Sequence, residues 1–283
     1  MSQESREALV WINAREGAFP EAGDRGLAYG DGVFETMRYS EARIPLLDRH
    51  MERMDTSCRR LAIPVDMDQL RDEIDGFVVA ARRRSARGII KLIVTRGTAG
   101  LGYRTDARAS PTRILIWHAL PDYPVSRASE GVAVRFCDAR LGMNVTLAGI
   151  KHLNRLEQVL ARMEWTDEDI VEGLMSDPRG RIVEGISTNI FLVSAGRLIT
   201  PTIDSCGVAG VMRGYIIEEV SRSLGIAVAT TNCERALLAG AQELFICNAV
   251  IGVWPVRKLG TKSYAVGSVT RRIRDYVAQQ FVA

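Results

Sequence analysis

Two stretches in the first hundred residues carry apolar side chains at every third or fourth position, the spacing of a helix with one buried face. The first covers residues 46–63 and stops at Pro64, a residue type that cannot continue a helix. The second covers residues 68–84. The pattern therefore predicts two amphipathic helices in the N-terminal part of the chain.

Short runs of apolar and β-branched residues surround these helices and are typical of strands. The strands predicted in this half of the chain are residues 9–19, 32–39, 88–97 and 112–120. A glycine-rich loop at residues 97–111 joins the last two. Strands and helices therefore mix within the first 120 residues.

The pattern breaks at residues 121–131, which contain two prolines, several polar residues and no apolar period. After this segment it resumes, and the main predicted elements are strands at 132–138, 182–185, 188–194 and 243–250 and helices at 211–225 and 269–282. We therefore expect two α+β domains, a smaller one at residues 1–120 and a larger one at residues 132–283, with 121–131 as the linker.

Composition narrows the functional class. A hydrophobic content of 47% and a charged content of 25% are typical of a soluble globular protein, and a net charge of +3 gives no reason to expect nucleic acid or a membrane as a partner. The three histidines form no ligand cluster, so no metal site is expected. Five scattered cysteines and the absence of a signal pattern at the N-terminus predict a reduced, cytoplasmic protein.

Arginine carries almost all of the positive charge. Of 37 basic residues only four are lysines, which leaves 33 arginines, and the lysines are Lys91, Lys151, Lys258 and Lys262. Arginine does not deprotonate in proteins and cannot act as an amine nucleophile. A search for a reactive amine therefore has four candidates.

Lys151 is the most unusual of the four, because it stands between Ile150 and His152 immediately before the helix predicted at 153–163. In one interpretation its stem covers apolar surface while the ammonium reaches water. In the other, burial and the positive end of the helix dipole favour the neutral amine, which attacks carbonyl groups. The residues alone leave both interpretations open.

Glu184 and two glycine-containing turns could form a site together with a reactive Lys151. Glu184 is either an exposed carboxylate at a strand end or a buried one that could keep a pyridine nitrogen protonated. A turn at residues 207–210 leads directly into a helix, and a helix start binds anions through its free N–H groups. A second turn, at 246–252, could add donors, and either Arg49 or Arg53 could reach a phosphate from the first helix.

An ordered set of motifs along nearly the whole chain also resembles the fold-type IV pyridoxal-phosphate enzymes. This group includes branched-chain and D-amino-acid aminotransferases and the aminodeoxychorismate lyases. The motifs are DRGLAYGDGVFET, LLDRHMERM, GIKHLNRLEQVLAR, RIVEGISTNIFLV, GVAGVMR and ELFICNAVIGVWPV. The resemblance implies a two-domain α+β fold like that of D-amino-acid aminotransferase, with pyridoxal 5'-phosphate at the domain junction and its lysine in the C-terminal domain.

The resemblance also implies roles for single residues. Lys151 matches the catalytic lysine that bonds the cofactor aldehyde, Glu184 the partner of the pyridine nitrogen, and Arg53 the phosphate-binding arginine of the first helix. The remaining cofactor ligands that it implies are backbone groups of Val211, Met212, Asn248 and Ala249.

The substrate-binding set is less well defined by the resemblance. Phe34 matches a pocket-lining aromatic residue, at a position where D-amino-acid aminotransferases tend to have tyrosine. The lyases often carry an additional arginine in the loop that reads Gly100-Leu101-Gly102-Tyr103 in this chain. We expect Tyr103, Arg96 and Arg104 near the substrate, but which arginine holds its carboxylates stays open.

Within the family, AGIKHLNRLEQVLAR and ICNA are most similar to the lyases, which convert 4-amino-4-deoxychorismate to 4-aminobenzoate and pyruvate for folate synthesis. The alternative is an aminotransferase for D- or branched-chain amino acids, and a third possibility is a non-catalytic protein that keeps the cofactor site. The resemblance further implies a small-molecule substrate and a homodimer.

Overall fold

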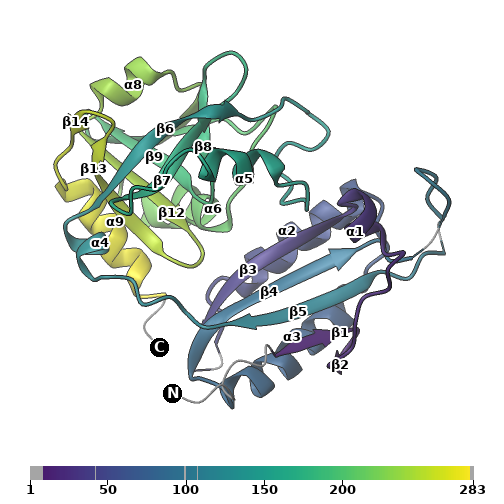
Figure 1. Cartoon of the computed structure of the whole chain (residues 1–283). Helices are drawn as coiled ribbons and strands as arrows, with labels where there is room; N and C mark the ends of the chain where they lie inside the picture. Colours follow the sequence, from purple (N-terminus) through teal and green to yellow (C-terminus); the bar gives the residue numbers. More distant parts are fainter. Residues whose placement is uncertain (1–8, 42, 99, 107, 281–283) are drawn as a thin grey trace. The chain divides into compact units, whose positions relative to one another are not determined.

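The computed structural model describes residues 9–41, 43–98, 100–106 and 108–280. These residues form two compact units (Figure 1). Unit 1 comprises the described residues up to Pro121 together with Lys151–Asn154, and unit 2 comprises Asp122–Ile150 and the described residues from Arg155 onward. The lysine segment, expected in the second domain, thus makes its contacts with the first.

Unit 1 is an antiparallel sheet with the strand order β2-β1-β5-β4-β3. Its elements are β1 (Val10–Ile12), β2 (Arg15–Glu16), α1 (Arg25–Tyr29), β3 (Gly32–Ser40), α2 (Leu47–Arg60), α3 (Met67–Arg82), β4 (Arg87–Thr95) and β5 (Thr112–His118). The helices α2 and α3 cover one face of the sheet (Figure 1). They match the two helices that the apolar spacing predicts.

One predicted strand of unit 1 is interrupted. Residues 9–19 were expected to form a single strand, whereas the structure has the hairpin β1–β2. Asn13 and Ala14 make its turn with φ values of 49° and 62°, the combination that a two-residue hairpin turn requires. The strand prediction was wrong here because the turn uses an Asn-Ala pair without the glycine that usually marks it.

Strand β3 alternates between two environments. Val33, Glu35, Met37 and Tyr39 are buried, whereas Phe34 and Thr36 between them are only partly buried. Glu35 contacts α2, so the buried set faces the helices and Phe34 lies on the opposite face. On its outer edge β3 pairs with the lysine segment through a bridge between Val33 and His152.

Unit 2 contains a mixed nine-stranded sheet in the order β11-β10-β9-β12-β13-β6-β7-β8, with β14 on β13. The strands are β6 (Val132–Arg140), β7 (Ile170–Ser176), β8 (Ile182–Gly185), β9 (Asn189–Ser194), β10 (Arg197–Pro201), β11 (Val228–Thr231), β12 (Glu243–Asn248), β13 (Gly252–Leu259) and β14 (Lys262–Ser263). Aliphatic side chains of β6, β9, β12 and β13 form its main core.

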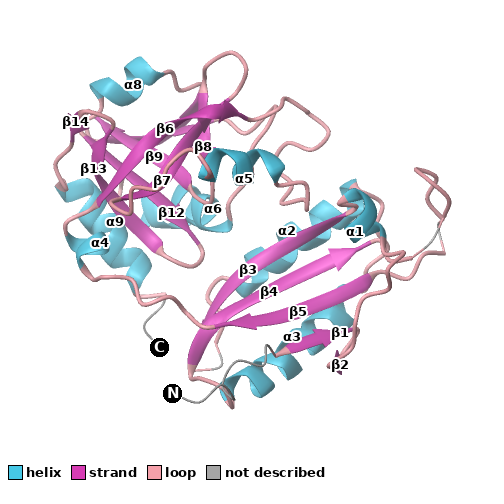
Figure 2. Cartoon of the chain, in the orientation of Figure 1, coloured by secondary structure: helices cyan, strands magenta, loops and turns pink. Residues whose placement is uncertain are grey.

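The helices of unit 2 lie around its strands (Figure 2). They are α4 (Ser126–Ser129), α5 (Leu156–Arg162), α6 (Val211–Tyr215), the π-helix η2 (Ile216–Val220), α7 (Ser221–Ser223), α8 (Arg235–Gly240) and α9 (Ser268–Ala278). The consecutive helices α6, η2 and α7 fill the helix predicted at 211–225, and Gly225 follows with a φ of 66°. Helix α4 falls inside the segment expected to link the domains.

The apolar face of α5 points outward in the single chain. Leu156, Val159, Leu160 and Met163 share the predicted face, and each is at least half exposed. The buried residues of this helix are Gln158 and Ala161. The spacing correctly identified an amphipathic helix, but it did not determine which face contacts the rest of the chain.

Candidate active site

Lys151 is fixed to the edge of β3 by its backbone and its side chain. Its carbonyl oxygen accepts a hydrogen bond from the N–H of Phe34 at 2.9 Å, and its ammonium nitrogen lies 4.2 Å from the centre of the Phe34 ring. The segment is extended, and α5 begins only at Leu156. The expected help from a helix dipole was therefore wrong, because that field acts within the first turn of a helix and Lys151 lies outside it.

A second lysine faces the same aromatic ring. The ammonium nitrogen of Lys91 lies 5.3 Å from the centre of the Phe34 ring. Lys91 pairs in register with Thr36, which shares a face of the sheet with Phe34. Lys91 was one of the four candidate amines, and its sequence position assigned it no role. A signal was available, because a lysine inside the apolar strand GIIKLIVT is costly to keep.

Arg53 is held by a buried carboxylate. Its Nε donates to Glu35 Oε1 at 2.7 Å, and Glu35 Oε2 also contacts His50 Nδ1 at 2.7 Å. Burial by itself would raise the pKa of Glu35, but the charges and hydrogen bonds of Arg53 and His50 outweigh it and hold the pKa at about 2. The ion pair fixes the guanidinium of Arg53 on α2.

Arg96, expected near the substrate, is buried in a network of its own. Its guanidinium donates to both carboxylate oxygens of Asp31 and to the carbonyl oxygens of Leu61 and Ala62. Burial would raise the pKa of Asp31, but the hydrogen bonds and charges of Arg96 and Arg25 lower it below its usual value. At least four of the five guanidinium N–H groups of Arg96 are thus used inside unit 1.

The glycine-rich loop presents the other two expected substrate residues. Tyr103 and Arg104 are both exposed, and the Tyr103 ring lies 5.5 Å from that of Tyr29. Arg25 donates to the carbonyl oxygen of Gly102 at 2.7 Å and so ties the loop to the Asp31 network. Arg104 therefore has a guanidinium on the surface, in contrast to Arg96.

Glu184 is buried in β8 and bound by a glycine-rich loop. Its Oε2 accepts the backbone N–H of Val208 at 2.8 Å, and the residue is 4% exposed. Gly207 has a φ of 85°, and a Cβ there would lie 2.7 Å from a methyl carbon of Val183. Only glycine fits this close approach. The interpretation of Glu184 as an exposed strand-end residue is therefore wrong.

The Glu184 loop also binds the chain that leads to Lys151. Gly149 donates to the carbonyl oxygen of Gly207 at 2.9 Å and accepts the N–H of Ala209 at 3.1 Å. These two residues flank Val208, the donor to Glu184. The loop that contacts the acid therefore also binds Gly149, and Lys151 follows Gly149 by two residues.

Helix α6 begins where this loop ends. Its N-cap is Gly210, and no side chain caps the helix. Asn189 Nδ2 donates to the carbonyl oxygen of Val208 at 3.1 Å and holds the entry to the helix in place. Val211 and Met212 are its first residues, so their backbone N–H groups lie at the positive end of the helix.

The second expected anion cup is a turn that Asn248 folds with its own side chain. Asn248 Oδ1 accepts the N–H groups of Val250 and Ile251 at 2.8 and 2.9 Å. Its Nδ2 donates to the carbonyl oxygen of Ser187 at 3.2 Å. Ala249 lies at the tip of this turn, directly after β12.

Glu172 anchors the neighbouring turn, and the sequence analysis missed it. It is 2% exposed and accepts hydrogen bonds from the backbone N–H groups of Gly173, Ile186 and Ser187 and from the Ser187 hydroxyl. Burial raises the pKa of Glu172, and these hydrogen bonds only partly oppose that effect. A signal was available, because Glu172 stands in the same local sequence, IVEG, as Glu184.

Among the described residues, no group of three or more histidine, cysteine, aspartate or glutamate side chains is placed to hold a metal ion. No helix in the described part of the chain is long and apolar enough to cross a bilayer.

Comparison with known proteins gives consistent results. The family described as Amino-transferase class IV matches residues 32–259. An aminodeoxychorismate lyase of Vibrio harveyi is 30% identical over 270 residues, covering 94% of this chain and 98% of that protein. A putative branched-chain-amino-acid aminotransferase of Methanocaldococcus jannaschii is 30% identical over 256 residues, covering 89% and 88%. The crystal structure of 4-amino-4-deoxychorismate lyase from Pseudomonas aeruginosa has a TM-score of 0.92 and 45% identity, covering 96% of this chain and 98% of that one.

Proposed function

This chain belongs to the class IV aminotransferase family, and we propose that it is a pyridoxal-phosphate-dependent lyase that converts 4-amino-4-deoxychorismate to 4-aminobenzoate and pyruvate. The observation that carries the proposal is the placement of the Lys151 amine over the Phe34 ring, on a segment bound by the same loop that holds Glu184. The 45% identity to the Pseudomonas aeruginosa lyase, over nearly the full length of both chains, supports this branch of the family.

The residues of the site fit the cofactor. The Lys151 amine would bond the aldehyde, and the buried carboxylate of Glu184 would accept a hydrogen bond from the protonated pyridine nitrogen. The uncapped start of α6 at Val211 and Met212 offers backbone donors for the phosphate, as does the turn at Asn248 and Ala249. We assign Arg53 to the same phosphate as a charged ligand.

Each group then has a defined task. Bound there, the cofactor supplies an electron-withdrawing ring that stabilises the negative charge left on a substrate carbon when its proton departs. Lys151 Nζ would take the proton from the ring carbon that bears the substrate's amino group, and Glu184 would keep the pyridine nitrogen protonated. The C–O bond to the enolpyruvyl group would then break with its electron pair on oxygen, and the product ring would become aromatic. The proton held by Lys151 would return to the departing enolate, which becomes pyruvate.

The substrate has two carboxylates, and we assign their binding to cations near Phe34 and on the glycine-rich loop. The ammonium group of Lys91 lies over the Phe34 ring, as that of Lys151 does, and the Arg104 guanidinium is exposed next to Tyr103. We assign Arg96 a structural role instead, because its donors are already used by Asp31 and two carbonyl groups. Phe34 would pack against the substrate ring.

A second copy of the chain completes the proposed enzyme. Leu156, Val159, Leu160 and Met163 form an exposed apolar face on α5, which a soluble monomer rarely leaves uncovered. We infer a homodimer in which this face is buried. The five cysteines are all free and buried, which is compatible with a reducing cytoplasm.

The decisive experiment compares two reactions of the purified, cofactor-loaded protein. With 4-amino-4-deoxychorismate, the proposal expects equal amounts of 4-aminobenzoate, followed by its fluorescence, and pyruvate, followed with lactate dehydrogenase. With D-alanine or L-leucine and 2-oxoglutarate, it expects little glutamate. Glutamate formation without 4-aminobenzoate would overturn the lyase assignment in favour of an aminotransferase. Light scattering during gel filtration measures the oligomeric state.

A further inference from the structure

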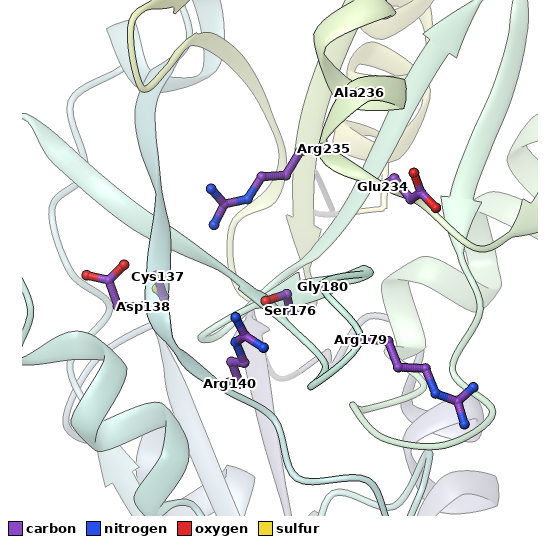
Figure 3. Close-up of a pocket in the computed structure, with 9 residues that line it drawn as sticks. All are labelled: Cys137, Asp138, Arg140, Ser176, Arg179, Gly180, Glu234, Arg235 and Ala236. Carbon is purple, nitrogen blue, oxygen red and sulfur yellow. The ribbon is translucent and has the colours of Figure 1, made fainter.

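A hollow of about 530 Å³ lies on unit 2, and none of its lining residues belongs to the proposed cofactor or substrate site. It is formed by the end of β6, the β7–β8 hairpin and the first turn of α8 (Figure 3). Its volume is within the range of small-molecule sites, roughly 300–1,000 Å³. Its walls are polar, however, which points to a charged ligand.

Three arginines line this hollow, and Figure 3 shows Arg179 directed away from the space that Arg140 and Arg235 approach from different elements. Arg140 comes from β6 and Arg235 from α8, and Figure 3 shows Ser176 between them. Arg140 donates one N–H to the carbonyl oxygen of Pro178 at 2.9 Å, and the Arg235 guanidinium lies over the Phe136 ring at 4.4 Å. Within the described residues, neither arginine has a carboxylate at ion-pair distance, so most of their ten N–H donors are available.

Ser176 gives a second and independent indication of a ligand. It is 6% exposed and lines the hollow at the end of β7. Its hydroxyl makes no hydrogen bond to any other residue that the structure describes. The hydroxyl oxygen is accessible from the hollow, so it is available to hydrogen-bond to a ligand bound there.

The acidic groups of the hollow do not neutralise its centre. Asp138 lies 3.8 Å from Arg135, and its side chain is almost fully exposed. Glu234 is exposed, and Figure 3 shows both carboxylates directed away from the space between the two arginines. Burial raises the pKa of the Cys137 thiol to about 12, so this residue adds no negative charge. The local charge therefore favours an anion.

We propose that this hollow binds a tetrahedral oxyanion, the phosphate group of a small molecule or inorganic phosphate, through Ser176, Arg140 and Arg235. A hydroxyl on the floor and two guanidinium groups on separate walls approach a ligand from three directions. This arrangement suits the distributed oxygens of a phosphate better than the two oxygens of a planar carboxylate. The proposal does not depend on the lyase assignment, since it uses none of the same residues.

Calorimetric titration of the cofactor-loaded enzyme with inorganic phosphate, in a chloride buffer, tests the proposal. The cofactor's own phosphate occupies the other anion site, so the heat reports on this hollow. We expect saturable one-site binding with a Kd of about 1 mM or lower. Glycerol 3-phosphate, sulfate and acetate are titrated in parallel. Tighter binding of the ester than of phosphate identifies a phosphorylated small molecule as the ligand class, and a preference for acetate overturns the proposal.

Three variants locate the binding. The double variant Arg140→Ala and Arg235→Ala should weaken phosphate binding by at least about tenfold, and Ser176→Ala, a smaller change, by roughly threefold to tenfold. Arg222→Ala removes an exposed arginine of α7 outside the hollow and should bind phosphate like the unmodified enzyme. Melting temperatures confirm folding. Unchanged affinity in both the double variant and Ser176→Ala, or no saturable heat up to about 20 mM phosphate, refutes the proposal.

Discussion

The Lys151 ammonium nitrogen lies 4.2 Å from the centre of the Phe34 ring, and the backbone groups of the same two residues share a hydrogen bond of 2.9 Å. Main chain and side chain thus fix Lys151 to one residue of β3, 117 positions earlier in the sequence. This pairing restricts the position of the amine. A surface lysine whose stem covers apolar surface needs no such restriction. It places the amine on the sheet face opposite α2 and α3.

Replacement of Lys151 by alanine should abolish stable cofactor binding and catalysis. We expect the desalted variant to be colourless and its turnover to fall by at least about 10²–10⁴-fold, because the cofactor anchor and the general base are the same nitrogen. Absorbance spectra and the 4-aminobenzoate assay measure both effects. The exposed Lys262 is the control, and Lys262→Ala should keep colour and rate. Normal turnover in Lys151→Ala would contradict the assignment.

Arg96 and Arg104 should give opposite phenotypes. Arg96→Ala removes the partner of buried Asp31 and leaves two carbonyl groups unsatisfied, so we expect a loss of about 3 kcal/mol in unfolding free energy. Arg104→Ala should leave the melting temperature unchanged but raise KM about tenfold, because it removes an exposed cation proposed to hold a substrate carboxylate. Urea unfolding and steady-state kinetics separate the two. A KM effect confined to Arg96→Ala would reverse the assignment.

Gly207→Ala should be much more harmful than Gly196→Ala. Both glycines have positive φ, 85° and 72°, so each substitution costs about 1–2 kcal/mol in backbone strain. A Cβ at Gly196 meets nothing within 4 Å, whereas one at Gly207 would meet Val183 at 2.7 Å and the Glu184 carboxyl at 3.4 Å. We therefore expect a further loss of about 1–3 kcal/mol and weaker cofactor retention only for Gly207→Ala. Equal stabilities of the two variants would contradict this prediction and show that the loop at Gly207 can rearrange to accommodate a Cβ.

Glu35 should make the enzyme sensitive to acid. Its pKa in the folded protein is about 2, below the ordinary value of 4.5, so its charged form stabilises the fold in full above pH 4.5. This contribution, of order 3 kcal/mol, is lost as the pH falls from 4.5 toward 2. The stability difference between the unmodified enzyme and Glu35→Gln should therefore shrink over that range in urea unfolding.

The cofactor ligands differ in how far the sequence could predict them. Lys151 stands out because arginine has replaced lysine nearly everywhere else, and Glu184 because it interrupts an apolar strand. The contacts of Lys91 and Glu172 could not be predicted. Lys91 contacts the ring of Phe34, and Glu172 binds the hydroxyl of Ser187, so each contact joins two different parts of the chain.

Local order in the sequence by itself determined the two helices of unit 1, most of the strands and the family. Periods of two and of three to four residues arise from the geometry of a single element, and the ordered motifs extend along nearly the whole chain. Only the tertiary structure decided that Lys151 pairs with β3, that α5 turns its apolar face outward, that Arg96 belongs to Asp31, and that Arg140, Arg235 and Ser176 meet. The physical reason is that such contacts join residues distant in sequence, and packing, hydrogen-bond satisfaction and charge pairing select them only when the whole chain is folded.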